Sequence, residues 1–175
     1  MAAARRVATE KSSPAQPLRV TRGTPRDIPT ILALTRGLAK YEQLSWECRI
    51  TASRLRRDGF GRSRYFETLI ARRGAPRVGF ARYFFTYSTF APRPTLYLED
   101  LFVLSEERGR GAGRALLSAL ARIAIRKGCG RFEWTVLHWN RPAIRFYEGL
   151  GAGLRRKWIL ARLTGAPLRR LAARR

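Results

Sequence analysis

The stretch "LFVLSEERGRGAGRALLSALARIA", residues 101–124, decides the fold of this chain. It begins with apolar residues typical of a buried strand, passes through a glycine-rich turn, and continues with apolar residues at helical spacing. A strand that enters a helix through such a turn is typical of phosphate-binding sites, because the backbone N–H groups at the helix start attract an anion. Turn formation alone is the alternative interpretation of the glycines.

Two common nucleotide-binding patterns fail in this turn. The Walker pattern requires a lysine after its last glycine, but Gly113 is followed by Arg114. The dinucleotide pattern GxGxxG requires a third glycine at the position of Arg114 or Leu116. What remains is Arg108-x-x-Gly111-x-Gly113, in which the arginine can add a charge-assisted hydrogen bond to a phosphate.

The surrounding sequence predicts alternating strands and helices on one sheet. Residues 95–104 are apolar at both alternating positions, which predicts a strand covered on two faces. Thr24 and Pro25 are typical of a helix start. The expected strands are 18–23, 64–71, 77–88, 95–104, 131–137 and 157–163, and the expected helices are 24–42, 51–58, 111–127 and 141–149.

The turn, in this context, resembles the acetyl-CoA pyrophosphate loop of the GNAT acetyltransferase superfamily. The segments "YLEDLFV" (97–103) before it and "WNRPAIRFYEGLGA" (139–152) after it are similar to the diamine acetyltransferase branch, which includes spermidine/spermine and thialysine acetyltransferases. The resemblance implies an α/β GNAT (acyl-CoA N-acyltransferase) fold, with a mixed, mostly antiparallel central sheet flanked by helices. We expect this domain over 18–168, after a disordered leader at 1–17 and before a basic tail at 169–175.

The resemblance also implies acetyl-CoA as co-substrate and no metal. The residues that it assigns to the cofactor lie on the end of the buried strand, on the glycine-rich turn and on the helix at 141–149. They are Leu101, Phe102, Val103, Arg108, Gly109, Arg110, Gly111, Ala112, Gly113, Arg114, Asn140 and Tyr147.

Acetyl transfer to an amine needs a proton acceptor, because a primary amine with a pKa near ~10.4 is protonated at pH 7. Glu99 and Asp100 are acids in an otherwise apolar strand, and a buried carboxylate is costly unless it is used or paired. The resemblance makes Glu99 the base, acting through water, and Tyr147 the proton donor to the departing CoA sulfur. A structural carboxylate and a core tyrosine are the alternatives.

The residues expected to bind the amine acceptor differ in part from those of the polyamine enzymes that the sequence resembles. Tyr41 and Glu42 match positions that line the amine site, to which Glu99 also contributes. Ser88 stands where an Asp would be, and Phe90 where a Trp would be. The cation-binding site is therefore less acidic, which favours a smaller or zwitterionic amine over a long polycation.

Composition limits the other possibilities. The 36 Lys and Arg residues against 12 Asp and Glu give a formal net charge of +24 and predict non-specific attraction to polyanions, although GC-rich codon usage explains scattered arginines equally well. Cys48 and Cys129 form no CxxC pair, and the single histidine, His138, is expected on the surface. We therefore expect no zinc site, and we expect the protein to reside in a reducing, cytoplasmic compartment. No apolar run approaches the roughly 20 residues of a membrane span.

Three functions stay open from the sequence. The first is an N-acetyltransferase for a small primary amine, working by direct attack in a ternary complex and, from the resemblance, as a homodimer. The second is a protein lysine or N-terminal acetyltransferase, since one fold serves both. The third is a basic nucleic-acid- or ribosome-associated protein that retains the GNAT fold mainly for binding.

Overall fold

The computed structural model describes residues 16–157 and 159–174. The chain forms two compact units, Met1–Thr135 and Val136–Arg175. Residues 1–15, the greater part of the expected leader, lie outside the described residues, as does Trp158.

The first unit is built on a five-stranded sheet in the order β1-β2-β3-β4-β5. Neighbouring strands from β1 to β4 are antiparallel, and β5 pairs with β4 in parallel. This mixed, mostly antiparallel sheet confirms the fold class expected from the sequence. The strands are β1 Leu18–Arg22, β2 Glu67–Arg73, β3 Arg77–Ser88, β4 Arg93–Val103 and β5 Arg131–Trp134.

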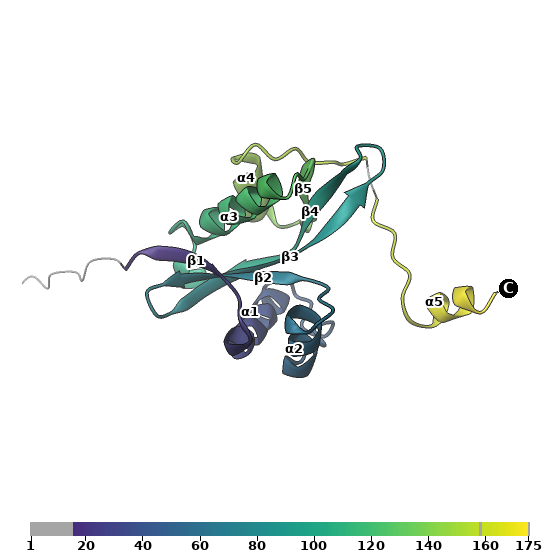
Figure 1. Cartoon of the computed structure of the whole chain (residues 1–175), viewed down its shortest axis with the longest axis horizontal. Helices are drawn as coiled ribbons and strands as arrows, with labels where there is room; N and C mark the ends of the chain where they lie inside the picture. The colour runs from purple at the N-terminus through teal and green to yellow at the C-terminus, as the bar shows by residue number, and fades with distance from the viewer. Residues whose placement is uncertain (1–15, 158, 175) are drawn as a thin grey trace, which may run out of the picture. The chain divides into compact units, whose positions relative to one another are not determined.

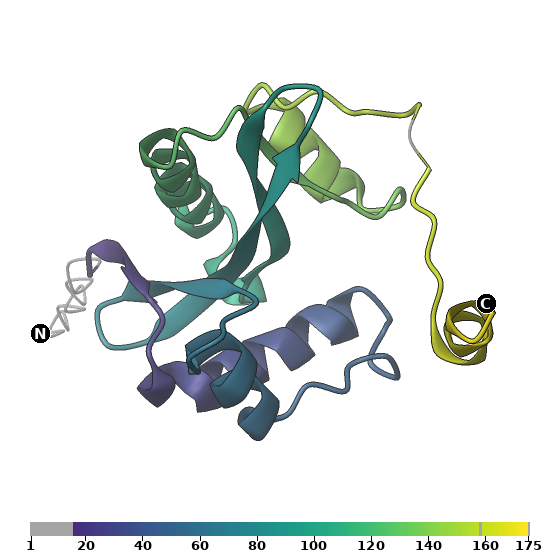
Figure 2. The ribbon, with the colours of Figure 1, turned by 45° about the vertical axis from the view of Figure 1, so that its right-hand side comes forward.

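Helices cover both faces of this sheet (Figures 1 and 2). Helices α1 (Ile28–Tyr41) and α2 (Ala52–Phe60) lie on one face, and α3 (Ala112–Arg126) lies on the other. The apolar stripes that predicted these helices are the buried ones. On α1 the buried side chains are Ile28, Ile31, Leu34 and Leu38, and on α3 they are Ala112, Leu116, Leu117, Leu120, Ile123 and Ala124.

The start of α1 is fixed by a buried carboxylate. Asp27, which is 1% exposed, accepts hydrogen bonds from the backbone N–H and the hydroxyl of Thr24 and closes a capping box. It also pairs with Arg72 on β2 and Arg77 on β3, each at 2.7 Å. Thr24 is the N-cap of a 3-10 turn, Pro25–Asp27, that leads directly into α1, and Asp27, the N-cap of α1, ties the helix to two strands.

The second unit contains α4 (Arg141–Glu148) and α5 (Gly165–Ala172). The strand expected over 157–163 is a wrong prediction, because residue 157 and residues 159–163 adopt no strand. Ile159 is 92% exposed there, and the segment has no ladder partner among the described residues. The expected boundary between 168 and 169 falls inside α5. The strand expected to reach 137 ends at Trp134.

Candidate functional site

The glycine-rich turn joins β4 to α3 in a conformation that suits an anion. Gly109 and Gly111 have φ values of +72° and +87°, and Gly111 is the N-cap of α3. A side chain at either position would meet no atom within 4 Å, so the turn is open to an incoming ligand. The first N–H groups of a helix have no partner within the helix, and with alternating left-handed residues before them they form an anion-binding concavity. The pyrophosphate of CoA fits this turn.

A cluster of charged side chains fastens the turn to the sheet. Glu107 accepts a hydrogen bond from Arg73 on β2 at 2.8 Å and another from Arg110 at 2.9 Å. Arg73 also donates to the backbone carbonyl of Arg110 at 3.0 Å. Because Arg73 bonds both ends of the segment 107–110, it limits the conformations that the turn can adopt.

Strand β4 carries a β-bulge at Glu99. Asp100 pairs with Arg82 of β3, and Leu98 pairs with the next residue, Tyr83, so Glu99 is the extra residue in the ladder. Glu99 is exposed, whereas Leu98 is buried. A bulge re-aims a side chain and interrupts a strand, and here it presents a carboxylate at the end of the apolar strand that leads into the turn.

The pairing of β4 with β5 stops next to this bulge. Its last pair is Leu98 with Trp134, although β4 continues to Val103 and its other edge stays paired with β3. An extended ligand that carries amide groups can pair with such a strand edge. Leu101–Val103, which were expected to bind the co-substrate, form this edge.

The end of α1 brings two expected acceptor residues to the turn. The guanidinium of Arg108 lies over the Tyr41 ring, 4.5 Å from its centre, and its Nε donates to the carbonyl of Val103 at 3.1 Å. Glu42 follows directly, as the C-cap of α1. Burial and the negative charge of Asp100 both raise the pKa of the Glu42 carboxyl. A residue expected to bind CoA, Arg108, therefore contacts a residue expected to bind the amine, Tyr41, within the first unit.

The sequence reasoning missed a buried arginine at this place. Arg82, on β3, is 8% exposed and pairs with Asp100 across the two strands at 2.7 Å. Burial raises the pKa of Asp100, and the charge of Arg82 opposes that rise. The signal was present in the sequence, since Arg82 interrupts the apolar run "VGFARYFF" (78–85).

Two other expected acceptor residues lie elsewhere. Ser88 is the last residue of β3, and its hydroxyl accepts from the backbone N–H of Ala91 in the hairpin turn at 3.3 Å. Phe90 is fully exposed at the tip of the same turn. Ser88 is five residues along β3 from Tyr83, which pairs beside the bulge, so roughly 17 Å separate the two places. The structure does not bring Ser88 or Phe90 to Glu99 within the first unit.

The remaining expected residues, Asn140 and Tyr147, lie on α4 in the second unit. The Asn140 side chain accepts from the N–H of Ala143 at 3.3 Å and caps the helix. Tyr147 is 7% exposed, and its ring centre lies 5.4 Å from that of Phe146. His138 is exposed before the helix, as expected.

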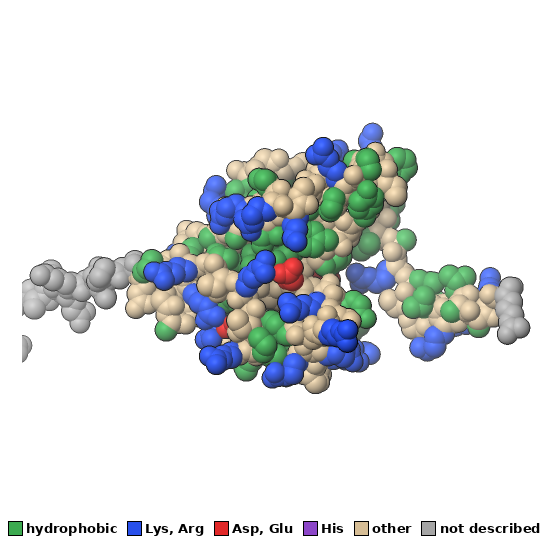
Figure 3. All heavy atoms as spheres, viewed as in Figure 1, with side chains coloured by type: hydrophobic (Ala, Val, Ile, Leu, Met, Phe, Trp, Pro, Cys, Tyr) green, Lys and Arg blue, Asp and Glu red, His purple; other side chains and the backbone are tan. Residues whose placement is uncertain are grey.

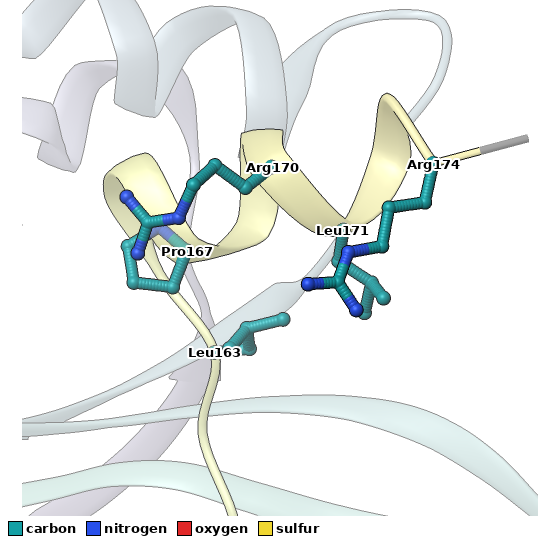
Figure 4. Close-up of a pocket in the computed structure, with 5 residues that line it drawn as sticks. All are labelled: Leu163, Pro167, Arg170, Leu171 and Arg174. Atoms are coloured by element: carbon teal, nitrogen blue, oxygen red, sulfur yellow. The ribbon is translucent and has the colours of Figure 1, made fainter.

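A hollow in the second unit does not resemble a ligand pocket. It has a volume of about 210 Å³, below the roughly 300–1,000 Å³ of small-molecule pockets. The side chains around it come from α5 and from the residues on either side of it, and Figure 4 shows them: Leu163, Pro167, Arg170, Leu171 and Arg174. Within residues 16–157 and 159–174 there is no group of three or more His, Cys, Asp or Glu able to hold a metal ion. Over the same residues, no helix has the length and apolarity to cross a membrane.

Comparison with known proteins agrees with this geometry. The model of the acetyltransferase (GNAT) family matches residues 36–152. This chain belongs to that family. Mouse thialysine N-epsilon-acetyltransferase is 35% identical over 89% of this chain and 98% of its own length. An L-ornithine N5-acetyltransferase of Arabidopsis thaliana is 43% identical, over 52% of this chain and 40% of its own. A Vibrio cholerae integron cassette protein of solved structure superposes with a TM-score of 0.76 at 27% identity, covering 90% of this chain and 98% of the other.

The resemblance inferred from the turn and its flanking segments is thereby confirmed. The chain is a GNAT N-acetyltransferase, and the acyl donor of the family is acetyl-CoA. The matched region contains the whole of the turn, the bulge at Glu99, and both Asn140 and Tyr147.

Proposed function

We propose that this chain acetylates a primary amine of a small molecule, and that the first unit holds the donor and the acceptor side by side. The observation that carries the proposal is the bulge at Glu99, which adjoins Asp100 on β4, the strand that precedes the glycine-rich turn. The charge of Asp100 acts on Glu42 at the end of α1. Because Leu101–Val103 connect the bulge to the segment that holds the turn, a thioester bound along this strand edge would end near Glu99.

The donor side would be bound through backbone groups and one arginine. The N–H groups at the start of α3 and the guanidinium of Arg108 would hold the pyrophosphate, and Leu101–Val103 would pair with the pantetheine amides. Gly109–Arg114 complete the proposed donor site of the first unit, and the family resemblance alone adds Asn140. CoA supplies the activated thioester, and the protein residues supply binding and proton transfer.

The chemistry would follow a direct attack. Glu99 accepts a proton from the ammonium through water, and the neutral amine nitrogen then forms a bond to the carbonyl carbon. The carbon–sulfur bond breaks, and the Tyr147 hydroxyl, to which the family resemblance assigns this step, donates its proton to the departing thiolate. A phenol suits this step because its pKa lies slightly above that of a thiol. The nitrogen loses its second proton to water as the amide forms, and a proton from solvent restores the phenol.

The acceptor would be an amine that Tyr41 and Glu42 bind as a cation. A carboxylate pairs with an ammonium, and a tyrosine ring attracts it through its face. The relatives named for thialysine and ornithine favour the side-chain amine of a basic amino acid, with diamines as the neighbouring class.

The test is a thiol-release assay with acetyl-CoA over thialysine, lysine, ornithine, diamines, aminoglycosides and peptide amines. We expect release with at least one basic amino acid or diamine, and a loss of at least about a hundredfold in kcat for Glu99→Gln. Glu47→Gln, a change at an exposed glutamate after α1, serves as the matched control and retains activity. Release with peptide amines alone would favour a protein acetyltransferase, and release with none would overturn the proposal.

The assembly, the location and the surface charge belong to the same proposal. A homodimer rests on the family resemblance, and a cytoplasmic location rests on Cys48 and Cys129, which form no CxxC pair. In Figure 3 basic side chains are spread over the face that is drawn, across α1, α2 and the sheet, and form no single stripe. This spread supports non-specific polyanion binding, which a steep decrease of RNA affinity with salt would reveal.

A further inference from the structure

The ion pair between Arg82 and Asp100 lies beside the proposed acceptor site. The two residues are cross-strand partners on β3 and β4, and their Nη1 and Oδ2 atoms are 2.7 Å apart. Asp100 directly follows the bulge at Glu99, and its charge acts on Glu42. The carboxylates of Glu42 and Asp100 thus act on one another, and that of Asp100 is paired with an arginine.

The surroundings of Arg82 hold its guanidinium in place. Its Nη2 donates to the hydroxyl of Thr35 on α1 at 3.1 Å. Its Cζ lies 4.8 Å from the centre of the Phe66 ring and 5.6 Å from that of Phe80. A guanidinium enclosed by two rings and a hydroxyl cannot turn out to solvent, so the charge opposite Asp100 is permanent.

This pairing changes the charge that an incoming amine meets. Without Arg82, Asp100 would offer an unpaired carboxylate next to Glu42 to the second ammonium of a diamine. With Arg82 in place, the charge of Asp100 is balanced, and a second ammonium nearby would be repelled by the guanidinium. Because the pair is largely removed from water, this effect is stronger than it would be on the surface.

We propose that Arg82 determines acceptor selectivity by balancing Asp100, so that the site prefers an amine whose far end carries no net positive charge. A basic amino acid meets this condition, since its carboxylate offsets its α-ammonium, whereas a diamine does not. Arg82 is a positioning residue in this reaction, because it acts through Asp100 and is itself enclosed. The inference rests on the proposed function and deepens it.

The matched acceptors for the test are L-lysine and 1,5-diaminopentane, which differ only in the carboxylate. The measured quantity is the ratio of their kcat/KM values in the thiol-release assay. Arg82→Met is expected to shift this ratio toward the diamine by about tenfold, a size reasonable for one charge at a partly buried site. Asp100→Asn is expected to shift it about tenfold the other way. The double variant, which removes both charges, is expected to return near the wild-type ratio.

Arg77→Met is the matched control, since it removes another arginine of β3 whose partner is Asp27 rather than Asp100. It should leave the ratio unchanged. If Arg82→Met does not fold, Asp100→Asn and the double variant still differ only in the charge at position 82, and their ratios should differ about tenfold. The inference would be overturned if the ratios of kcat/KM for the two acceptors differed by less than twofold between Asp100→Asn and the double variant, or between Arg82→Met and the wild type. The proposed function would not be affected by that result. A wild-type protein that releases thiol with neither acceptor nor any other amine would overturn the proposed function and the inference with it.

Discussion

The guanidinium of Arg108 lies over the ring of Tyr41, 4.5 Å from its centre. Arg108 opens the anion-binding turn, and Tyr41 is the last residue of α1, so this contact joins the proposed donor site to the proposed acceptor site. The hydrogen bond from Arg108 to the carbonyl of Val103 fixes the same side chain to the end of β4. The aromatic ring thereby holds the cation that we propose for the pyrophosphate of CoA.

Tyr41→Leu should weaken CoA binding about two- to fivefold, because a cation–π contact at an exposed site contributes about 0.5–1 kcal/mol. Tyr41→Phe retains the ring and should bind CoA as the wild type does. Calorimetric titration of CoA measures both. An equal effect of Tyr41→Leu in an Arg108→Met background would show that the tyrosine does not act through the arginine.

Gly111→Ala should weaken CoA binding by about tenfold or more. The residue has a φ of +87°, where a side chain costs about 1–2 kcal/mol, and a shift of the turn to relieve that strain would move the N–H groups away from the anion. Gly128→Ala is the matched control, since Gly128 has a φ of +66° and equally open surroundings but follows the other end of α3. Both variants should lower the melting temperature similarly. A similar loss of CoA affinity in both would contradict the role of the turn.

Arg73→Met should weaken CoA binding about three- to tenfold. The variant loses the hydrogen bonds from Arg73 to Glu107 and to the carbonyl of Arg110, so that CoA must order the turn when it binds. The measurement is CoA affinity together with hydrogen exchange at residues 107–111. Arg19→Met, a change on β1 at an exposed arginine, is the control and should alter neither. Weaker binding without faster exchange would argue against this mechanism.

Tyr147→Phe should lower kcat by about a hundredfold and leave CoA affinity within about twofold, because only the proton for the departing sulfur is removed. Single-turnover and binding measurements separate the two quantities. Tyr87→Phe, at a tyrosine of β3 that is 63% exposed, should leave kcat unchanged. An unchanged kcat in Tyr147→Phe would exclude the phenol as the acid.

Asp27 should make folding sensitive to acid. Burial alone would raise the pKa of this carboxyl, but hydrogen bonds from Arg77, Thr24 and Arg72 lower it from 3.8 to about 2. A lowered pKa adds stability that is fully present above pH 4 and is lost as the pH falls toward 2; its size is about 2 kcal/mol. The free energy of unfolding of the wild type and of Asp27→Asn, measured from pH 7 to pH 2, should converge over that interval. A constant difference would contradict this assignment.

Local patterns in the sequence determined the main elements of the first unit. Apolar residues at helical spacing predicted α1 and α3, and the doubly apolar run predicted β4, because burial selects such residues wherever an element packs on a core. The motif around Gly111 predicted both the turn between β4 and α3 and the family. The same reasoning was wrong at 157–163, because alternation alone cannot supply the partner that a strand requires.

Only the tertiary structure decided which distant side chains meet. The pairing of β3 with β4 sets Arg82 against Asp100 and leaves Glu99 as the extra residue, and no local pattern encodes such a register. The packing of α1 on the sheet brings Tyr41 under Arg108. The sequence by itself thus determined the fold, the family and the glycine-rich turn, since these depend on residues close together in the chain. The charge balance of the proposed acceptor site depends on contacts across strands, and the tertiary structure alone decided it.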